Sequence, residues 1–558
     1  MTWFTLAKNW LKDNRRIAIL SILAVLFFFI YSFLILSAPL KFNSPDENAN
    51  YFFIKLFAER GELKYYEPLN LIAQNIIHPR SINVSNGYLV PGSFLGLILI
   101  YGSIAKVFSI GVVPFLTPLI SVVTVFFFYG LVKKIFDDKI AFVSSILLLF
   151  LPAFWYYAAR GLFLNVLFVD LLVVGFYWLT HTNKARIEHE LNTNVRNSFS
   201  WKEVCCYFLA GLFIGLALAV RTSEIIWVGT VLLALLIIYH RRIKWQEAAV
   251  FIAGIILVFS PIFYYNYNLY GGLFHTGYEQ LDSQASNSQG ANILAKIFLP
   301  FGFHPRSAWR NFSQYFLQLF WYLVIPLIVG LVLWFQINYK RIKSKTDIGA
   351  NKQFIYLLFY LFIILFLIVY YGSWDFSDNI IPGQITIGNS HVRYWLPIFV
   401  LSLPFVGLFL IKIFDYFKQK WLGYSLSLAA GVLIIILSSY AVLAQSEESL
   451  LAVRENLIDY QNKAEKVLAL TELDSIIITE RSDKIFFPER RIIVNLDNSM
   501  VLTNLPALLE KAPVYYYTYR TTADVEELNE KVLKNYNLKL TNEVQIEGKE
   551  KLLKVERL

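Results

Sequence analysis

Charged residues are scarce in this chain: Asp, Glu, Lys and Arg make up only 16% of its 558 residues, against about 25% in an average soluble domain. Hydrophobic residues reach 57%, so the chain is too apolar to dissolve as one globule. Only two cysteines occur, adjacent at Cys205 and Cys206 in an apolar run, which excludes a disulfide scaffold and a thiolate zinc site. These deficits predict a polytopic membrane protein.

The net charge of +10 comes from the larger, N-terminal part of the chain. Residues 1–444 hold 34 basic and 20 acidic side chains, whereas residues 445–558 hold 16 basic and 20 acidic ones. The basic excess falls between apolar runs, as membrane topology requires, so it does not predict a nucleic-acid partner. We expect a transmembrane domain over residues 1–444 and a soluble domain over residues 445–558.

Eleven apolar runs are candidate membrane spans, since a bilayer takes roughly 20 residues per helix. They cover residues 17–40, 111–132, 140–157, 162–179, 204–220, 225–239, 248–267, 315–337, 354–371, 394–414 and 422–443. A twelfth run, 88–108, contains Pro91, three glycines and Lys106. If this run does not cross, 21 basic residues lie in inner loops and 12 in longer outer loops, as the positive-inside rule demands. The run is therefore predicted to be an interfacial or re-entrant helix.

This topology predicts a multi-pass protein of the cell membrane with a cytoplasmic amino terminus and, after eleven crossings, an extracytoplasmic C-terminal domain. Three sizeable loops share the outer face: 41–109, 268–314 and 372–393. The second loop contains the polar stretch 282–292, for which a lid and a plain linker are both open.

The C-terminal domain is predicted to be a small α/β unit. Strand-like runs cover 475–479, 491–495, 513–519, 539–546 and 551–555, with a helix over 523–534. The last two strands turn around Glu547 and Gly548, which is typical of a hairpin. Because no catalytic motif stands out there, we expect this domain to bind or cover something rather than to perform chemistry.

Two carboxylates, Asp46 and Glu47, follow the first span directly. Pro45 stiffens the chain before them, so they should sit at a defined depth near the lipid surface. A functional carboxylate and a helix N-cap made by Asp46 or Asn48 are both open. His78 precedes the twelfth run and is also a candidate, although a lone histidine at such a junction is often structural.

Further polar side chains cluster at the outer ends of the spans, where each charge needs a partner or a ligand. The candidates are Arg160, Asn165, Arg221, Glu224, His275, Tyr278 and Arg393. Arg221 and Glu224 bracket one outer turn and could simply pair with each other. Outward-facing arginine at membrane level commonly binds phosphate, so the arginines among these candidates predict a phosphate site on the face that carries Asp46.

Three of these patterns together resemble the GT-C membrane glycosyltransferases, especially the family 39 type, which includes protein O-mannosyltransferases and aminoarabinose transferases. The patterns are the Asp-Glu pair after the first span, the His-Pro at 78–79 before an interfacial run, and Tyr-Tyr-x-x-Arg at 156–160. The resemblance covers roughly residues 17–239. It implies a GT-C-like fold with interfacial helices in the first outer loop.

The resemblance also implies roles for single residues. Asp46 would be the catalytic carboxylate, with Glu47 beside it in the Asp-Glu pair. The family's His-Pro-Pro is matched at His78 except that Arg80 replaces the second proline. The family's Ser-Arg-(x)4-Asp is matched at Arg160, but Asn165 stands at the acidic position, which puts in doubt a second carboxylate and any metal site that needs one.

The implied reaction moves one sugar from a polyprenyl phosphate to a hydroxyl or amine of a protein, lipid or cell-wall glycan outside the cytoplasm. Asp46 would be the base and the arginines would hold the lipid phosphate, with inversion at the sugar. No cofactor is certain, and a divalent metal is possible. One alternative is a ligase or polymerase that uses a lipid-diphosphate oligosaccharide. Another is a lipid or glycan transporter, which would place ionisable residues at mid-membrane, where only Asp170 is found here.

Overall fold

The computed structural model describes residues 14–36, 40–193, 201–278, 299–344, 348–374, 383–417 and 419–558. The stretch 282–292, predicted as a lid or linker, lies outside them. The described residues of Met1–Ile35, Pro114–Ser260 and Ser288–Ala452 form one compact unit, unit 1. Those of Leu36–Val113, Pro261–Asn287 and Val453–Leu558 form a second, unit 2.

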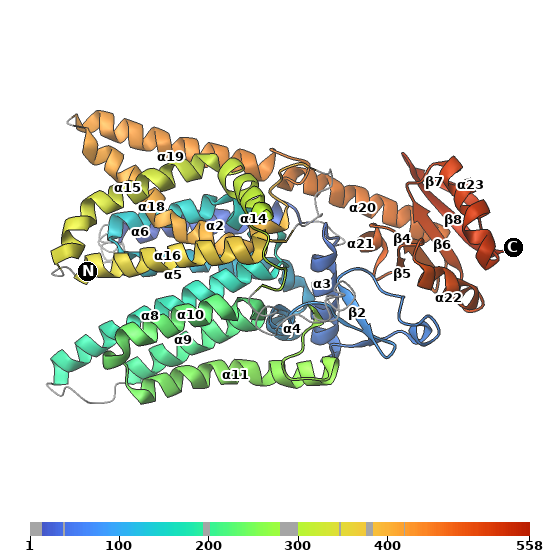
Figure 1. The fold of residues 1–558 in the computed structure, drawn as a ribbon, viewed down its shortest axis with the longest axis horizontal. Coiled ribbons are helices and arrows are strands. Elements are labelled where there is room, and N and C mark those ends of the chain that lie inside the picture. Colours follow the sequence, from blue (N-terminus) through green and yellow to red (C-terminus); the bar gives the residue numbers. More distant parts are fainter. Residues whose placement is uncertain are drawn as a thin grey trace, which may run out of the picture. The chain divides into compact units, whose positions relative to one another are not determined.

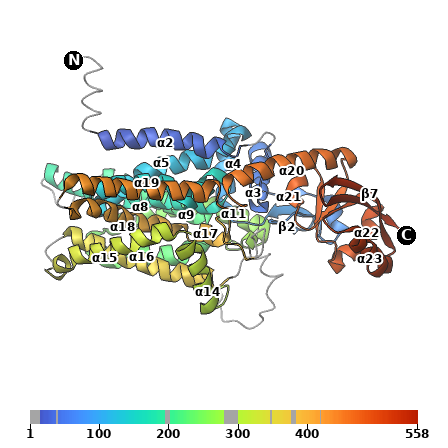
Figure 2. The same ribbon diagram turned by 90° about the horizontal axis from the view of Figure 1, so that it is seen from above.

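Unit 1 is a helical assembly, shown in Figure 1. Its helices are α2 (Arg15–Phe33), α5 (Val113–Ile135), α6 (Asp138–Phe150), α7 (Pro152–Arg160), α8 (Leu164–Thr193), α9 (Trp201–Val220), α10 (Ile225–Tyr239), α11 (Trp245–Tyr270), α14 (Pro305–Phe312), α15 (Trp321–Ser344), α16 (Ile348–Gly372), α17 (Ser390–Tyr394), α18 (Leu396–Tyr416) and α19 (Lys420–Leu443). The end of α11 belongs to unit 2. Helices α8 and α9 lie side by side along their length, and α18 packs against α15, α16 and α19 (Figure 2).

The helices confirm the predicted membrane spans. Among the described residues, ten are long and apolar enough to cross a bilayer. Helices α6 and α7, bent by 51° at Leu151, bring the number to eleven when they count as one span. This matches the eleven spans predicted from hydropathy and makes the chain a multi-pass membrane protein.

The twelfth run is too short to cross but is not a single helix. Its start forms strand β3 (Tyr88–Pro91), and only Gly96–Phe108 is helical, as α4. Thirteen residues span roughly 20 Å, less than the bilayer core. The prediction of one helix over the whole run was wrong, because Tyr88–Pro91 pairs with two other short strands of the first outer loop.

Those strands belong to unit 2. Helix α3 (Pro45–Arg60) leads into β1 (Tyr65–Tyr66), the 3₁₀ helix η1 (Pro68–Leu71), β2 (Ile82–Ser85) and β3. The three strands form an antiparallel sheet in the order β1-β3-β2. The loop at residues 41–109 therefore contains a small sheet as well as the helices α3 and α4.

The C-terminal part of unit 2 contains the predicted α/β arrangement. A long helix α20 (Leu450–Leu470) precedes β4 (Ile476–Thr479), α21 (Asp483–Phe486), β5 (Arg491–Val494), α22 (Ser499–Leu509), β6 (Val514–Thr518), α23 (Thr522–Lys531), β7 (Leu538–Glu547) and β8 (Glu550–Arg557). The strand order is β5-β4-β6-β8-β7, with β4 parallel to β5 and β6, and β8 antiparallel to β6 and β7. All five predicted strands are present.

One hydrophobic core joins the first outer loop to this sheet. Ala73 and Ile77 of the loop are buried together with Ile476 and Ile493 of the sheet and Leu505 of α22. Ile77 also forms an isolated antiparallel bridge with Ile493. Burial of an isoleucine side chain such as this one contributes roughly 1.5–3 kcal/mol to stability. The first outer loop and the C-terminal sheet are thus parts of one unit, and the predicted domain boundary at residue 444 stays a prediction.

Candidate active site

Asp46 lies in the first turn of α3. The helix begins with Pro45, and Ser44 is its N-cap. The Ser44 hydroxyl accepts a hydrogen bond from the Asp46 backbone N–H at 3.3 Å, while Glu47 accepts one from the Ser44 N–H at 3.1 Å. This capping box satisfies backbone donors that the helix cannot satisfy itself. The positive end of the α3 helix dipole therefore lies beside the Asp46 carboxylate.

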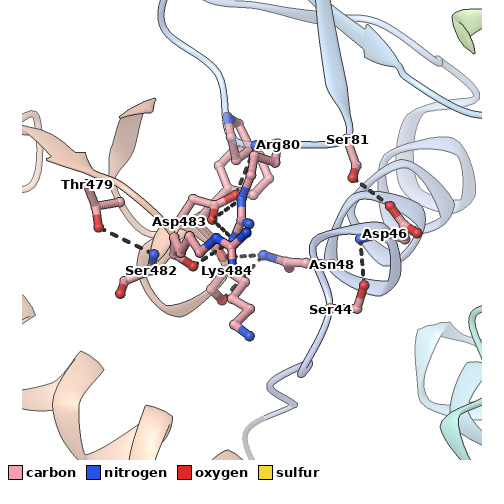
Figure 3. A network of polar contacts seen from close by, with 12 residues as sticks. Ser44, Asp46, Asn48, Arg80, Ser81, Thr479, Ser482, Asp483 and Lys484 are labelled. Carbon is pink, nitrogen blue, oxygen red and sulfur yellow. Dashed lines mark hydrogen bonds and ion pairs between the residues drawn. The ribbon is translucent and has the colours of Figure 1, made fainter. Parts of the chain in front are cut away.

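The side chain of Asp46 is half-buried and held by Ser81. The Ser81 hydroxyl donates to Asp46 Oδ1 at 2.6 Å (Figure 3). One helical turn further along α3, buried Asn50 accepts a hydrogen bond from the Ser93 hydroxyl at 3.0 Å. Ser81, Ser93 and Asn50 were not predicted from the sequence, although the i, i+4 spacing of Asp46 and Asn50 places both on one helix face.

Glu47 is 2% exposed and completes the capping box. Of the two alternatives left open by the sequence, the helix N-cap made by Asp46 or Asn48 is not found, because Ser44 occupies that position. The Asn48 amide instead donates to the backbone oxygens of Lys484 and Phe487, at 3.4 and 3.2 Å. A catalytic role for Glu47 stays a prediction.

His78 is half-buried in the loop before β2, with Nδ1 3.0 Å from the Pro79 carbonyl oxygen. Burial lowers the pKa of its imidazole below the ordinary value of 6.5. Burial therefore favours the neutral ring, and a binding role for His78 stays a prediction.

The two candidates of the second outer loop lie in different surroundings. The Tyr278 ring packs against Phe94 at 4.8 Å between centroids, next to Ser93 in the chain. The Gly277 carbonyl accepts a hydrogen bond from the Asn83 amide at 2.6 Å, which fixes this turn against the small sheet. His275 is exposed, with Nδ1 3.4 Å from the Tyr270 carbonyl oxygen. The structure thus places Tyr278 against Phe94, the neighbour of the serine that donates to Asn50. Binding roles for Tyr278 and His275 stay predictions.

In unit 1, the three predicted arginines come together around two aromatic rings. The guanidinium carbons of Arg160 and Arg393 each lie 4.7 Å from the Phe163 centroid. The Tyr394 ring is shared in the same way by Arg393 at 5.3 Å and Arg221 at 4.7 Å. We call these five residues the arginine cluster. The packing of two arginines on Phe163 was not predicted, although the sequence places this aromatic residue three positions after Arg160.

Each arginine of the cluster is also held by hydrogen bonds. Arg160 donates to the Tyr156 hydroxyl at 3.0 Å, and Arg393 donates to the Ser390 hydroxyl at 2.9 Å. Arg221 donates from Nε and Nη2 to Glu224 Oε1, at 2.9 and 2.7 Å. The ion pair between Arg221 and Glu224 that the sequence left open is thus present, and both partners are buried.

Glu224 is tied to its surroundings by two more donors. The Tyr371 hydroxyl donates to its Oε1 at 2.7 Å, and the Trp227 indole donates to its Oε2. The last candidate, Asn165, is 5% exposed in the first turn of α8, two residues after Phe163. Rings and buried partners hold the guanidinium groups in fixed orientations, which suits recognition of an anion such as phosphate.

An apolar cavity of about 470 Å³ lies within unit 1. Its walls come from α5, α8, α9, α10, α16 and α18, with Val169, Tyr356 and Leu401 among the lining residues. Trp227, which donates to Glu224, also lines it. Trp227 therefore links the cavity to the ion pair between Arg221 and Glu224. The apolar walls of the cavity suit a hydrocarbon chain.

In the part of the chain that the structure describes, no group of three or more His, Cys, Asp or Glu side chains could hold a metal ion.

No protein-family model and no curated protein matches the sequence. Several solved structures, in contrast, superpose on the fold. The archaeal oligosaccharyltransferase AglB from Archaeoglobus fulgidus, in complex with an inhibitory peptide and a dolichol-phosphate, superposes with a TM-score of 0.56 at 12% identity, over 91% of this chain and 70% of that one. A structure of the A. fulgidus enzyme with Zn and sulfate gives a TM-score of 0.52 at 14% identity, over 89% and 67%.

ArnT from Cupriavidus metallidurans, bound to undecaprenyl phosphate, superposes with a TM-score of 0.53 at 9% identity, over 96% of this chain and 97% of that one. Identities this low establish the fold alone. The fold class expected from the sequence, a helical membrane assembly with a C-terminal sheet domain, is confirmed. The chain has the GT-C fold of these membrane glycosyltransferases.

Proposed function

We propose that the protein is a membrane glycosyltransferase that moves a monosaccharide from a polyprenyl-phosphate donor to an acceptor on the extracytoplasmic face. The observation that carries this proposal is the arginine cluster, in which three arginines, from α7, from α17 and at the N-cap of η3 (Thr222–Glu224), share two aromatic rings. Such a concentration of oriented guanidinium groups suits a phosphate at the membrane surface.

The donor class follows from the cluster and the cavity together. A phosphate held by the arginines could extend its lipid chain into the apolar cavity, which Trp227 connects to Glu224. Two structures with the same fold were solved with lipid phosphates, dolichol-phosphate and undecaprenyl phosphate. A polyprenyl phosphate is therefore the carrier that we propose for this chain.

Asp46 is the proposed base. It takes the proton from the acceptor hydroxyl or amine while the acceptor attacks the anomeric carbon of the sugar. The bond between that carbon and the phosphate oxygen breaks, and its electron pair leaves with the polyprenyl phosphate. The arginine cluster stabilises the charge that develops there. A single displacement inverts the anomeric configuration, and no step is assigned to a metal.

The remaining parts of the proposal concern topology and acceptor. The amino terminus lies in the cytoplasm, and the C-terminal sheet lies outside, with Asp46 on the same side. The acceptor is a protein, a lipid or a cell-wall glycan. We propose Tyr278 and His78 as hydrogen-bonding groups for the substrate.

A second candidate is transfer of a preassembled oligosaccharide from a lipid diphosphate. It is favoured by the superposition on an archaeal oligosaccharyltransferase over 91% of this chain. We prefer the monosaccharide reaction, which uses a lipid monophosphate. ArnT was solved with such a lipid, undecaprenyl phosphate, and the match spans 97% of that chain as well as 96% of this one. A transporter explains neither the loop carboxylate nor the arginine cluster.

The two reactions are separated by a donor panel. Purified protein in liposomes is given undecaprenyl and dolichyl phosphates that carry radiolabelled hexoses or pentoses and, in parallel, a radiolabelled lipid-diphosphate oligosaccharide. A membrane extract is the acceptor source. We expect one labelled monophosphate to be consumed, with label passing to an acceptor and free polyprenyl phosphate released. Consumption of a lipid-diphosphate oligosaccharide instead would establish the second candidate, and consumption of neither would refute both.

A further inference from the structure

Arg80, the residue that replaces the second proline of the family motif, binds a buried carboxylate of the C-terminal part of unit 2. Asp483 is 0% exposed and accepts three hydrogen bonds from Arg80: from the backbone N–H at 2.9 Å, from Nε at 2.9 Å and from Nη2 at 2.6 Å. The same Nη2 donates to the Arg481 carbonyl oxygen at 2.6 Å. Because the Asp483 carboxylate accepts from both the backbone and the side chain of Arg80, it fixes the position and orientation of Arg80.

The next residue, Ser81, is the one that holds Asp46. Ser81 adopts φ +63°, a left-handed conformation that a non-glycine residue keeps only when its surroundings impose it. A Cβ at Gly92 would lie 2.6 Å from the Ser81 carbonyl oxygen, so the chain is closely packed on that side too. Figure 3 shows the resulting line of side chains from Asp483 through Arg80 and Ser81 to Asp46.

Residues in and after α21 also contact the chain just before and just after Asp46 in the sequence. Lys484 donates to the Asn43 carbonyl oxygen at 2.7 Å, immediately before the N-cap of α3. Asn48, two residues after Asp46, donates to the Phe487 carbonyl oxygen at 3.2 Å. Lys41 donates to the Ile485 carbonyl oxygen and to Glu489 Oε1, both at 3.0 Å.

Residues 483–489 thus contact both stretches of chain that place the carboxylate, 41–48 and 80–81. We infer that residues 483–489 form a positioning element for Asp46, with Asp483 acting on it through Arg80 and Ser81. The C-terminal sheet domain then serves the reaction without touching the reacting atoms. This inference rests on the proposed function, since it assigns a role in turnover only if Asp46 is the base. It also gives Arg80 a purpose that the family motif does not predict.

The test compares Asp483→Asn with a matched control, Asp497→Asn. Asp497 pairs with Arg520 elsewhere in the same domain and is half exposed. We expect Asp483→Asn to lower kcat about 10- to 100-fold, because a small displacement of a reacting group costs this much. The KM for the labelled donor of the panel above should stay unchanged, because the arginine cluster is untouched. The control should keep both values.

A substrate-independent measurement accompanies the kinetics. Amide hydrogen exchange in the first turns of α3 should quicken in Asp483→Asn and stay at the wild-type rate in Asp497→Asn. If Asp483→Asn does not fold, Arg80→Lys is used instead, since it keeps the charge and loses the fork that contacts two acceptors. The same lower kcat and faster exchange are then expected from Arg80→Lys.

A double-mutant cycle tests the route through Ser81. If Asp483 acts through Ser81, adding Asp483→Asn to Ser81→Ala should lower kcat by much less than it does in the wild type. Fully additive losses, a wild-type kcat in Asp483→Asn, or an equal loss in the Asp497 control would each overturn the inference. If Asp46→Asn is inactive, the proposed function is supported whatever the Asp483 variants show. If Asp46→Asn is active, the proposed function and this inference both fall.

Discussion

At the residue scale, the arginine cluster depends on guanidinium chemistry that lysine cannot supply. Arg160, Arg221 and Arg393 each lie over at least one aromatic ring and also donate to a hydroxyl or carboxylate. A planar group can stack and donate at the same time, whereas an ammonium is a point charge. The oriented donors of the cluster are therefore a property of arginine itself and not only of positive charge.

Arg221→Ala should raise the KM for the polyprenyl-phosphate donor about 10- to 100-fold, because a hydrogen bond to a charged group contributes about 1.5–3 kcal/mol. The acceptor KM should change little. Arg221→Lys should recover part of the loss. Arg557→Ala, which removes an exposed arginine paired with Glu510 in the C-terminal sheet, is the control. Equal donor affinities in wild type and Arg221→Ala would remove Arg221 from the phosphate site.

His78 gives a prediction about pH and stability. Because burial lowers its pKa in the native protein, the unfolded chain binds the proton more readily. The stabilising contribution is therefore complete above pH 6.5, the ordinary value, and is lost as the pH falls from there through the native pKa. His78→Gln should flatten the fall of Tm between about pH 7.5 and 5.5, as measured by intrinsic fluorescence in detergent. An unchanged slope in the variant would contradict this assignment.

At the element scale, length and periodicity decided what could be predicted from the sequence. The spans and the strands of the C-terminal sheet carry long apolar or alternating runs, and all were predicted. The strand β1 has only two residues and β2 only four, so neither shows a period. Helix α20 was missed because charged and polar residues interrupt its apolar positions, so it lacks the long apolar run that marks a span. The N-cap of α3 could not be assigned from the sequence because Ser, Asp and Asn are all good caps.

The capping box of α3 gives a prediction with an internal control. Ser44→Ala should cost about 0.5–2 kcal/mol of stability. Thr521→Ala removes the equivalent capping box of α23, so it should cost a similar amount. Only Ser44→Ala should also lower kcat, since only α3 carries Asp46. Thermal unfolding and turnover of both variants check this. Equal turnover in the two variants would show that the α3 cap has no role beyond stability.

At the scale of the whole molecule, the main surprise is the composition of unit 2. Residues 73–80 of the first outer loop join a core and an ion pair formed with residues about 400 positions later in the chain. Nothing local in Ala73, Ile77 or Arg80 signals this, because tertiary partners leave no mark on sequence periodicity. Among the candidate site residues, the arginines were predicted together on topology alone. The shared rings were not predicted, because the fold brings Arg393 to Phe163 and Arg221 to Tyr394 from distant positions in the chain.

The predicted orientation can be tested in intact cells. Cys205 and Cys206 are first changed to serine, and single cysteines are then placed at Lys549 in the β7–β8 turn and at Arg241 between α10 and α11, both exposed. A membrane-impermeant maleimide should label position 549 in intact cells and position 241 only after permeabilisation. The reverse pattern would place Asp46 on the cytoplasmic side and refute the proposed topology.

The proposed base is tested most directly by the turnover of Asp46→Asn. Asparagine keeps the shape of the side chain and an oxygen that can accept the Ser81 hydrogen bond, but it cannot take a proton. The purified variant in liposomes, supplied with the labelled donor that wild type consumes, should transfer sugar at least about 100-fold more slowly. Its expression and Tm should match wild type. Turnover close to the wild-type rate would show that Asp46 is not the base and would contradict the account.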